Sequence, residues 1–348
     1  MKRVGIFQNT FTAGGRIKVV LAMTRVFNEL DVVPDLIAFR STLSEEKLTQ
    51  SGSPPVRARL RVLRNVTRGL SEYKYVRLNQ RIDALSDEYE LLVNSNNTLA
   101  SLRGSPNLIH YVHFPREARL LDRYSNSMIH SRLARVLFLK MYRSFQKDVT
   151  SSGAFMANSD FTKSAMLDVY PLDPDDIRVI YPPVDGGASR AEPRREIKRV
   201  ISLGRFGENK NQLFQIEIAE KVPEAQFSIV GFVNNARSLR YFRRCERKIH
   251  QKGLSNVTLI RDAHREQVAN QLSSASVFLH TMADEPFGLS TVESMSFGCI
   301  PLCHNSGGQK EIVANPELLF TSLRDAVSKL KRLIKMKLEE SDAMRRGL

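Results

Sequence analysis

Cysteine is scarce in this sequence of 348 residues, which contains only Cys245, Cys299 and Cys303. Three thiols cannot build the disulfide framework of a small secreted domain, and no group of cysteines and histidines has the spacing of a zinc site. Cys299 and Cys303 flank an apolar run, so we interpret them as small core residues and not as ligands. The cysteine content therefore indicates a reducing compartment.

Long apolar segments are also absent. No stretch approaches the roughly 20 uninterrupted apolar residues that a membrane-spanning helix needs, which excludes an integral membrane protein. The chain begins MKRVGIF, which is basic, but its apolar run is too short for a secretory leader. We also find no internal repeat and no low-complexity tract. We therefore expect a cytoplasmic protein.

Acidic residues are outnumbered, with 37 Asp and Glu against 52 Lys and Arg, so the formal net charge is +15. Apolar residues make up 42%, which is ordinary for a folded protein and excludes a disordered chain. At roughly 100–200 residues per domain, the length indicates two domains. A basic surface attracts nucleic acid, an anionic membrane or phosphate-bearing small molecules, and composition alone does not distinguish them.

Short apolar runs alternate with amphipathic stretches along most of the chain. Gly14-Gly15 opens a helix over 16–30, and the alternation restarts after a linker at 182–195 that is rich in Pro, Gly, Ser and Arg. This pattern predicts α/β domains whose parallel sheets are covered by helices on both faces. The predicted strands are 3–7, 32–39, 90–94, 107–114, 154–159 and 177–184, then 200–206, 227–232, 257–260, 277–280 and 300–305.

The predicted architecture is two doubly wound α/β domains that face each other, with a basic helix over 323–346 at the end of the chain. In such sheets ligands bind beyond the carboxyl ends of the strands. The loops that follow the strands are therefore the places to look for functional residues.

Two segments concentrate positive charge. Residues 57–82 carry eight Lys and Arg against one acid, Glu72, which would suit a nucleic-acid-binding surface. Residues 132–147 form a helical pattern with apolar side chains on one face and basic ones on the other. That helix either lies on an anionic membrane or packs its apolar face against a core.

The strongest motif is EPFGLSTVESMSFGCIPLCHNSGGQKEIV, residues 285–313, in which Glu285 and Glu293 are separated by seven residues. A Pro-Phe-Gly loop follows Glu285 and precedes a predicted helix, whose first backbone N–H groups form an anion site. Glu285 would lie near the phosphates of a ligand, and Glu293 would accept hydrogen bonds from a vicinal diol. The alternative is an acidic helix start with no ligand.

Further candidate residues follow other predicted strands. The segment GRFGENKNQ (204–212) supplies Arg205 and Lys210, two cations that would neutralise a diphosphate without a metal ion. Gly14-Gly15 allows a close backbone approach to an anion, and His113 ends another strand. For Arg205 and Lys210 the alternative is two solvated charges on a loop. For His113 it is a structural histidine with a hydrogen-bond partner inside the fold.

Two weaker motifs have structural interpretations. Asn158-Ser159 would line a cleft, or Ser159 or Asp160 would be an ordinary helix N-cap. Asp173-Pro174-Asp175 has the form of an Asp-x-Asp metal motif, but its position in a proline turn before a strand favours the turn.

Together these motifs resemble the retaining glycosyltransferases of the GT-B fold, and the likeness covers nearly the whole chain, most densely 199–313. Several strings are most similar to the branch that adds α-1,2-mannose from GDP-mannose to lipid-linked oligosaccharide. These strings are HYVHFP (110–115), FMANSDFT (155–162), YPPVD (181–185), ISLGRFGENKNQLFQI (201–216) and HNSGGQKEIV (304–313).

The resemblance implies two Rossmann-like domains with an active-site cleft between them. Residues 1–185 would bind the acceptor and residues 186–322 the nucleotide sugar, while 323–348 would be a basic helix that packs back toward the N-terminal domain. It implies transfer of a hexose with retention of configuration, and no cofactor or metal. The implied partners are a nucleotide diphosphate sugar and a glycan or lipid-linked acceptor, with peripheral attachment to an anionic membrane and no nucleic acid.

The resemblance also implies a role for each site residue. His113 and Glu285 would contact the donor sugar, Arg205 and Lys210 would hold the diphosphate, and Glu293 would bind the ribose diol. Base recognition would come from the region of Phe232, Val233 and Arg261. The backbone contacts to sugar and phosphate would come from Gly15, Phe287, Gly288 and Leu289.

One departure from the mannosyltransferase branch concerns Pro286, where that branch usually has a histidine. A donor with uridine diphosphate in place of guanosine diphosphate therefore remains an alternative. A basic nucleic-acid-binding protein is a second alternative, and a fold that binds nucleotide sugar without transferring it is a third.

Overall fold

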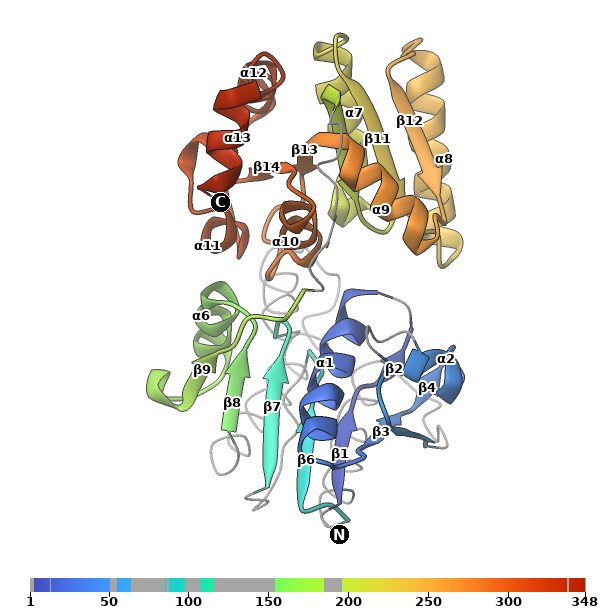
Figure 1. Ribbon diagram of the computed structural model, residues 1–348, viewed down its shortest axis with the longest axis vertical. Helices are drawn as coiled ribbons and strands as arrows, with labels where there is room; N and C mark the ends of the chain where they lie inside the picture. The colour runs from blue at the N-terminus through green and yellow to red at the C-terminus, as the bar shows by residue number, and fades with distance from the viewer. Residues whose placement is uncertain are drawn as a thin grey trace, which may run out of the picture. The chain divides into compact units, whose positions relative to one another are not determined.

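The computed structural model of the chain describes residues 3–12, 14–50, 55–63, 85, 88–97, 107–115, 154–184, 196–336 and 338–347. It divides into an N-terminal unit, Met1–Pro183, and a C-terminal unit, Val184–Leu348 (Figure 1). The predicted helix 132–147 lies outside the described residues. So do residues 64–82 of the basic stretch and residues 185–195 of the predicted linker, whereas the start of the basic stretch, 57–63, is described.

The N-terminal unit is built on a parallel sheet of seven strands in the order β5-β3-β1-β6-β7-β8-β9. Its interior strands β1 and β3 are buried along their whole length, as expected for strands covered on both faces. The six strands predicted in this half are confirmed. The strands are β1 (Val4–Phe7), β3 (Asp35–Ala38), β5 (Arg59–Val62), β6 (Leu91–Asn94), β7 (Leu108–Val112), β8 (Ala154–Ala157) and β9 (Ile177–Val179), with a small separate sheet of β2 (Thr10–Phe11) and β4 (Arg40–Ser41).

The helix predicted after Gly14-Gly15 is α1 (Gly15–Glu29), which covers one face of this sheet (Figure 1). Its buried residues Ile17, Val20 and Leu21 recur at helical spacing and pack against the strands. The other described helices here are α2 (Glu45–Gln50), α6 (Asp160–Val169) and the short 3₁₀ helix η1 (Pro174–Asp176).

The start of the basic stretch 57–82 forms edge strand β5, which the sequence analysis did not predict. Its three described arginines each have an acidic partner, so they neutralise charge within the unit. The pairs are Arg57–Asp31 at 3.1 Å, Arg59–Asp35 at 3.2 Å and Arg61–Glu88 at 2.6 Å.

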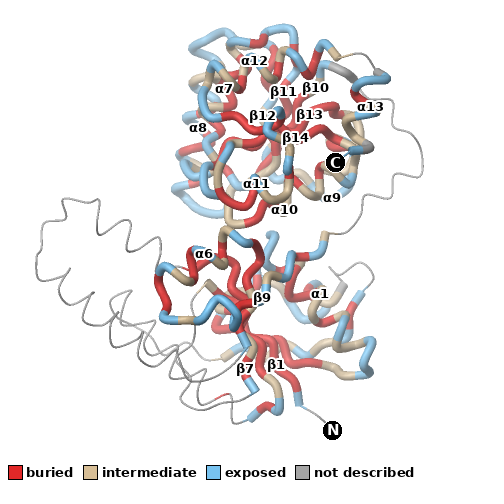
Figure 2. The backbone as a smooth tube through the Cα atoms, turned by 90° about the vertical axis from the view of Figure 1, so that its left-hand side faces the viewer, coloured by how far each residue is buried: buried red, intermediate tan, exposed pale blue. Residues whose placement is uncertain are grey.

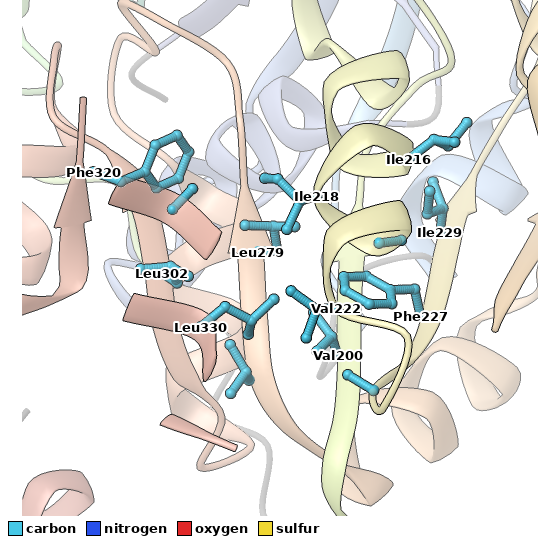
Figure 3. Close-up of a cluster of buried hydrophobic side chains, with 14 of the residues drawn as sticks. Val200, Ile216, Ile218, Val222, Phe227, Ile229, Leu279, Leu302, Phe320 and Leu330 are labelled. Carbon is cyan, nitrogen blue, oxygen red and sulfur yellow. The ribbon is translucent and has the colours of Figure 1, made fainter. Parts of the chain in front are cut away.

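The C-terminal unit contains a parallel sheet of six strands in the order β12-β11-β10-β13-β14-β15. Buried aliphatic and aromatic side chains from the sheet and its helices form one large core, including Val200, Ile218, Phe227 and Leu302 (Figure 3). The five strands predicted in this half are confirmed. The strands are β10 (Glu196–Leu203), β11 (Gln226–Gly231), β12 (Val257–Arg261), β13 (Ala275–His280), β14 (Ile300–His304) and β15 (Leu319–Phe320).

The three cysteines are buried free thiols, which confirms the prediction that Cys299 and Cys303 are core residues, and Cys303 lies within β14. Burial raises the pKa of the Cys303 thiol to about 12, so it stays protonated at neutral pH. The helices of this unit are α7 (Gln212–Lys221), α8 (Ala236–Gln251), α9 (Arg265–Ser274), α10 (Leu289–Ser296), α11 (Gln309–Val313), α12 (Leu323–Leu333) and α13 (Leu338–Arg346), with the 3₁₀ helices η2 (Glu208–Lys210) and η3 (Pro316–Leu318).

The single basic helix predicted over 323–346 is wrong, because the chain forms two helices there, α12 and α13. α12 buries Leu330 and Leu333 in the core of the C-terminal unit, and Met344 of α13 packs against the same core. In the described part of the chain, no helix combines the length and the apolar character that crossing a membrane requires.

Both sheets have the strand order of a doubly wound fold. From the first strand the chain adds strands toward one edge of the sheet, then returns and adds the rest on the other side of that first strand. In the C-terminal unit the reversal falls between β10 and β13, which pair in parallel through Val200 with Val277 and Ile201 with Phe278. The loops that leave these two strands therefore begin side by side at the carboxyl edge of the sheet. They are residues 204–211 and 281–288.

Candidate active site

Lys210 and Glu285, which the sequence places 75 residues apart, form an ion pair in the C-terminal unit. Lys210 ends η2 in the loop after β10, and Glu285 lies in the loop between β13 and α10. The Lys210 Nζ atom contacts Glu285 Oε2, and only 22% and 16% of the two side chains are exposed. The structure thus brings together two residues that were predicted from separate motifs.

The Glu285 carboxyl is ionised in this environment. Its burial by itself would raise the pKa, but the Lys210 ammonium and the His280 imidazole outweigh that effect. The net result is a pKa well below the usual range of a glutamic acid. At neutral pH the site therefore presents a partly enclosed carboxylate, which accepts hydrogen bonds and does not donate them.

His280, the last residue of β13, is a site residue that the sequence analysis missed. Its Nε2 atom lies 3.2 Å from Glu285 Oε2, and the Gln309 Nε2 amide lies 3.4 Å from its Nδ1. Burial lowers the pKa of this imidazole, so it is neutral at pH 7 and carries one ring proton. Of its two neutral tautomers, the one with the proton on Nε2 presents an N–H toward the Glu285 carboxylate and leaves Nδ1 to accept from the Gln309 amide.

A chain of buried hydrogen bonds ties the two loops together. The Thr281 hydroxyl donates to the backbone carbonyl of Lys210 at 3.0 Å, and the Gln215 amide donates to the same hydroxyl at 2.9 Å. Ser202 on β10 donates to Gln215 Oε1 at 2.8 Å. These contacts fix the backbone of Lys210 relative to β13, which holds its ammonium beside Glu285.

The glycine pair Gly307-Gly308 in the HNSGGQKEIV string supports the backbone around Glu285. The Gly308 N–H donates to the Glu285 carbonyl at 2.8 Å. Gly307 has a φ of 63°, and a Cβ at either glycine would collide with backbone atoms of residues 284–287. Side chains are therefore excluded at both positions because the two loops approach each other too closely.

The N-terminus of α10 follows Glu285 by four residues and has no capping side chain. Gly288 precedes the helix with a φ of 118°, no side chain caps it, and no acidic residue lies in its first turn. The first helical hydrogen bond runs from Thr291 N to Gly288 O, so the N–H groups of Leu289 and Ser290 precede the helical ladder. These donors and the helix dipole suit an anion.

The other residues predicted around α10 lie as follows. Phe287 is buried, and Glu293 is half-buried about one and a half turns along the helix from Gly288. Arg205 shares the loop of Lys210, but its side chain is exposed and only its carbonyl is held, by the Gln212 amide at 3.0 Å. The structure therefore does not bring Arg205 into the Lys210–Glu285 pair.

The predicted base-recognition residues lie at the ends of the neighbouring strands β11 and β12. Phe232 is 39% exposed, and the Val233 N–H donates to Asp262 Oδ1 at 3.0 Å. Arg261 pairs with the same carboxylate, its Nε atom 3.2 Å from Asp262 Oδ2. Asp262 therefore orders the backbone and the cation at this edge.

In the N-terminal unit, His113 follows β7 and is buried. Its Nε2 atom lies 3.0 Å from the Ser95 hydroxyl, and burial, helped by the charge of Arg16, lowers its pKa to about 3. The imidazole is therefore neutral and can exchange only neutral hydrogen bonds with a ligand. Gly15 begins α1, which has no side-chain cap and no acid in its first turn.

The two weaker motifs are structural. Ser159 caps α6, accepting a hydrogen bond from Thr162 N at 2.9 Å. Asp173 accepts one from Asp175 N at 2.9 Å at the start of η1, which confirms the turn interpretation. Among the described residues, no three His, Cys, Asp or Glu side chains gather as a metal-binding group would.

The buried histidines of the N-terminal unit predict a loss of stability in mild acid. Burial lowers the pKa of both His110 and His113 to about 3, against about 6.5 in an unfolded chain. Between these values only the unfolded chain takes up the protons, so stability falls as the pH drops below about 6.5. For each imidazole, the free energy of unfolding falls by at most about 1.4 kcal/mol per pH unit.

Urea unfolding of the full chain between pH 7.5 and 5.5 measures this effect. We expect His110→Gln to flatten the pH dependence, whereas His250→Gln, at an exposed position of α8, should leave it unchanged. Equal slopes in the wild type and His110→Gln would show that His110 is not the titrating group.

Comparison with known proteins gives the family. Residues 13–186 match the model for Glycosyltransferase Family 4, and residues 189–347 match the model for Glycosyl transferases group 1. The chain is 28% identical over 207 residues to the GDP-Man:Man(3)GlcNAc(2)-PP-Dol alpha-1,2-mannosyltransferase of Xenopus laevis, covering 55% of this chain and 42% of the relative. The human enzyme of the same name is 28% identical over 180 residues, covering 47% and 36%. The chain thus spans less than half the length of these relatives.

Two solved structures show the same fold. WaaG, a glycosyltransferase involved in lipopolysaccharide biosynthesis, superposes with a TM-score of 0.72 and 14% identity, covering 99% of this chain and 94% of that one. Anabaena HepE in complex with UDP and glucose superposes with a TM-score of 0.71 and 14% identity, covering 99% and 92%. The predicted pair of doubly wound α/β units is confirmed as the GT-B type. The family models, the strand order and these superpositions agree that the chain belongs to the family 4 glycosyltransferases.

Proposed function

We propose that this protein is a retaining glycosyltransferase that moves mannose from GDP-mannose to a hydroxyl of a lipid-linked glycan. The observation that carries the proposal is the Lys210–Glu285 ion pair at the strand-order reversal, with the uncapped N-terminus of α10 four residues after Glu285. This arrangement combines a cation and free backbone donors for a diphosphate with a carboxylate for sugar hydroxyls. The mannosyltransferase relatives support the choice of donor and acceptor.

Each group has a distinct role in this proposal. Lys210, the exposed Arg205 and the first N–H groups of α10 bind the diphosphate, with the backbone of Gly15 contributing from α1. Glu285 accepts hydrogen bonds from hydroxyls of the donor sugar, with His280 holding the carboxylate in place. Neutral His113 exchanges a hydrogen bond with the sugar near its reacting carbon.

The proposed reaction breaks the bond between the sugar and the diphosphate. Negative charge grows on the leaving phosphate oxygen, and the fixed positive charge of Lys210 and the α10 N-terminus stabilises it. The acceptor hydroxyl attacks from the same face and gives its proton to the departing oxygen, which retains the anomeric configuration. Because these groups supply the positive charge, the proposal includes no metal ion.

The proposal includes a membrane surface, because a lipid-linked acceptor resides in one. It also carries an alternative donor: with Pro286 in place of the usual histidine, a UDP-sugar would keep the mechanism and change the sugar. Both questions are open to direct measurement.

Replacing Glu293 with alanine is expected to weaken nucleotide binding. Charge-assisted hydrogen bonds are each worth roughly 1.5–3 kcal/mol, so loss of the ribose contact should lower the affinity at least about tenfold. Calorimetry with the nucleoside diphosphate alone measures it. Glu266→Ala on α9 is the matched control, exposed and in the first turn of its helix. An unchanged affinity in Glu293→Ala would remove this residue from the ribose site.

The decisive experiment for the proposal is calorimetry with GDP, UDP and ADP in the absence of added metal. Selective GDP binding supports the GDP-mannose donor, and a transfer assay with a lipid-linked acceptor then tests the reaction and its stereochemistry. A preference for UDP would keep the mechanism and move the donor to a UDP-sugar. Failure to bind any nucleoside diphosphate would overturn the proposed function.

A further inference from the structure

Helix α8 carries an unusual concentration of charge. Its sequence, ARSLRYFRRCERKIHQ, contains five arginines and one lysine against a single acid, Glu246. The helix thus accounts for five units of the net charge of +15 within 16 residues. None of the motifs of the proposed active site includes it.

The arginines lie on one side of the helix. The buried residues Ser238, Tyr241, Phe242 and Cys245 recur at helical spacing and face the core of the C-terminal unit. At 100° per residue the arginines fall on the opposite side, and all five are exposed. Figure 2 shows α8 at the surface of its unit with exposed segments along its length. The arginine face consists of Arg237, Arg240, Arg243, Arg244 and Arg247.

Ion pairs within the fold account for little of this charge. Arg244 pairs with Glu208, and at the end of the helix Lys248 pairs with Glu217. Within the part of the chain that the structure describes, no ion pair involves the other four arginines of the face. One of those, Arg237, lies in the first turn of the helix, where the helix dipole disfavours positive charge. Stabilisation of α8 itself therefore does not explain why so many arginines lie on this face.

We propose that the arginine face of α8 is a docking surface for an anionic phospholipid membrane. A helix of 16 residues is about 24 Å long, so the arginines can contact several lipid headgroups at once. The exposed side of α8 presents no large apolar side chain, so the contact is electrostatic and involves no insertion. The choice of a lipid partner is consistent with the proposed function, whose acceptor is lipid-linked, but the surface does not depend on the transfer reaction.

Nucleic acid fits this face less well. Both aromatic residues of α8, Tyr241 and Phe242, point into the core, so the face has no platform on which bases could stack. A planar anionic surface requires no such platform.

Vesicle co-sedimentation of the full chain tests the proposal without donor or acceptor. We expect binding to phosphatidylcholine vesicles that contain phosphatidylserine, weakening as salt is added, and none to phosphatidylcholine alone. Each basic residue near such a surface contributes about fivefold in affinity. The double variant Arg240→Glu/Arg247→Glu should therefore bind at least about 25-fold more weakly.

The matched control is Arg324→Glu/Lys335→Glu, which makes the same charge change at exposed positions near α12. We expect this control to lose at most a few-fold in vesicle affinity. Nucleoside diphosphate affinity, measured on both variants, reports whether the C-terminal unit is intact. In the α8 variant the new glutamates face Arg244 and Arg243 at a spacing of four residues, which favours the helix.

Three outcomes would overturn the proposal: no binding to anionic vesicles at low salt, equal losses in the two variants, or tighter binding to RNA or DNA than to vesicles through the same arginines. If the wild-type protein binds anionic vesicles but transfers no sugar to a soluble acceptor, the proposed function is contradicted and the proposed membrane surface is not.

Discussion

Replacing Lys210 with alanine is expected to lower turnover by about two to three decades, the range found when one donor to a developing oxyanion is removed. The ammonium is held beside Glu285, four residues before the uncapped N-terminus of α10, where the leaving diphosphate would gain charge. Its backbone is fixed by Thr281, so the charge is in place before the reaction begins. The ammonium has three N–H donors, so it can keep its contact with Glu285 and donate to the leaving phosphate as well.

The variant also removes the counter-ion of Glu285. Without Lys210 the pKa of the Glu285 carboxyl should rise, because burial raises it and the largest opposing interaction is gone. A pH–rate profile of Lys210→Ala should therefore gain an acidic limb that the wild type lacks in the same range. A purely structural lysine would not produce this change.

Steady-state transfer rates with saturating donor measure the effect. Lys221→Ala, at the exposed end of α7, is the control and should match the wild type. Arg205→Ala tests the second predicted cation, and its exposed position leads us to expect a smaller loss, of about one decade. Turnover near that of the wild type in Lys210→Ala would exclude the diphosphate role.

The sequence was enough to predict that Lys210 and Glu285 lie at the same edge of the sheet, but not that their side chains form an ion pair. Strand patterning and the doubly wound order place both loops at the same sheet edge, because β10 and β13 are neighbours. Which side chains touch there depends on loop backbone geometry, which is fixed by contacts such as that of Gly308 N with Glu285 O. The sequence analysis therefore assigned the two residues to different parts of the ligand.

His280 was missed for a related reason. It appears in the sequence as the last residue of an apolar strand, with no motif around it, and its partner Gln309 is 29 residues further on. The sequence did offer a signal for His280, since polar residues at the carboxyl ends of parallel strands lie at the sheet edge where ligands bind. The same rule had singled out His113, which lies at the corresponding end of a strand in the N-terminal unit.

The C-terminal helix shows where helical patterning is ambiguous. Residues 334–337 contain neither proline nor glycine, so nothing obvious interrupts the pattern between α12 and α13. Two acidic residues, Glu339 and Glu340, mark the first turn of α13, which is the composition expected of a new helix N-terminus. The edge strand β5 was missed because its alternating arginines were interpreted as a charged surface.

Replacing Glu285 with glutamine is expected to lower turnover at least about a hundredfold while leaving nucleoside diphosphate affinity nearly unchanged. One carboxylate oxygen, Oε2, contacts both the Lys210 ammonium and His280 Nε2, and the other oxygen, Oε1, would accept a sugar hydroxyl. A glutamine can keep an acceptor oxygen at only one of these two places, because its amide nitrogen donates and does not accept. Either the Lys210 ammonium or the sugar hydroxyl therefore loses its acceptor, and the sugar loses the charge that orients it.

The neighbouring residue provides the control, since Asp284→Asn removes one negative charge from an exposed side chain at the adjacent position of the same loop. This change should leave both turnover and nucleotide affinity close to those of the wild type. The comparison with Glu293→Ala separates two roles that sequence spacing alone could not distinguish: loss of turnover at Glu285 and loss of nucleotide affinity at Glu293. If Glu285→Gln instead weakened nucleotide binding and spared turnover, Glu285 would belong to the nucleotide subsite, and the sugar would have to be held by other groups.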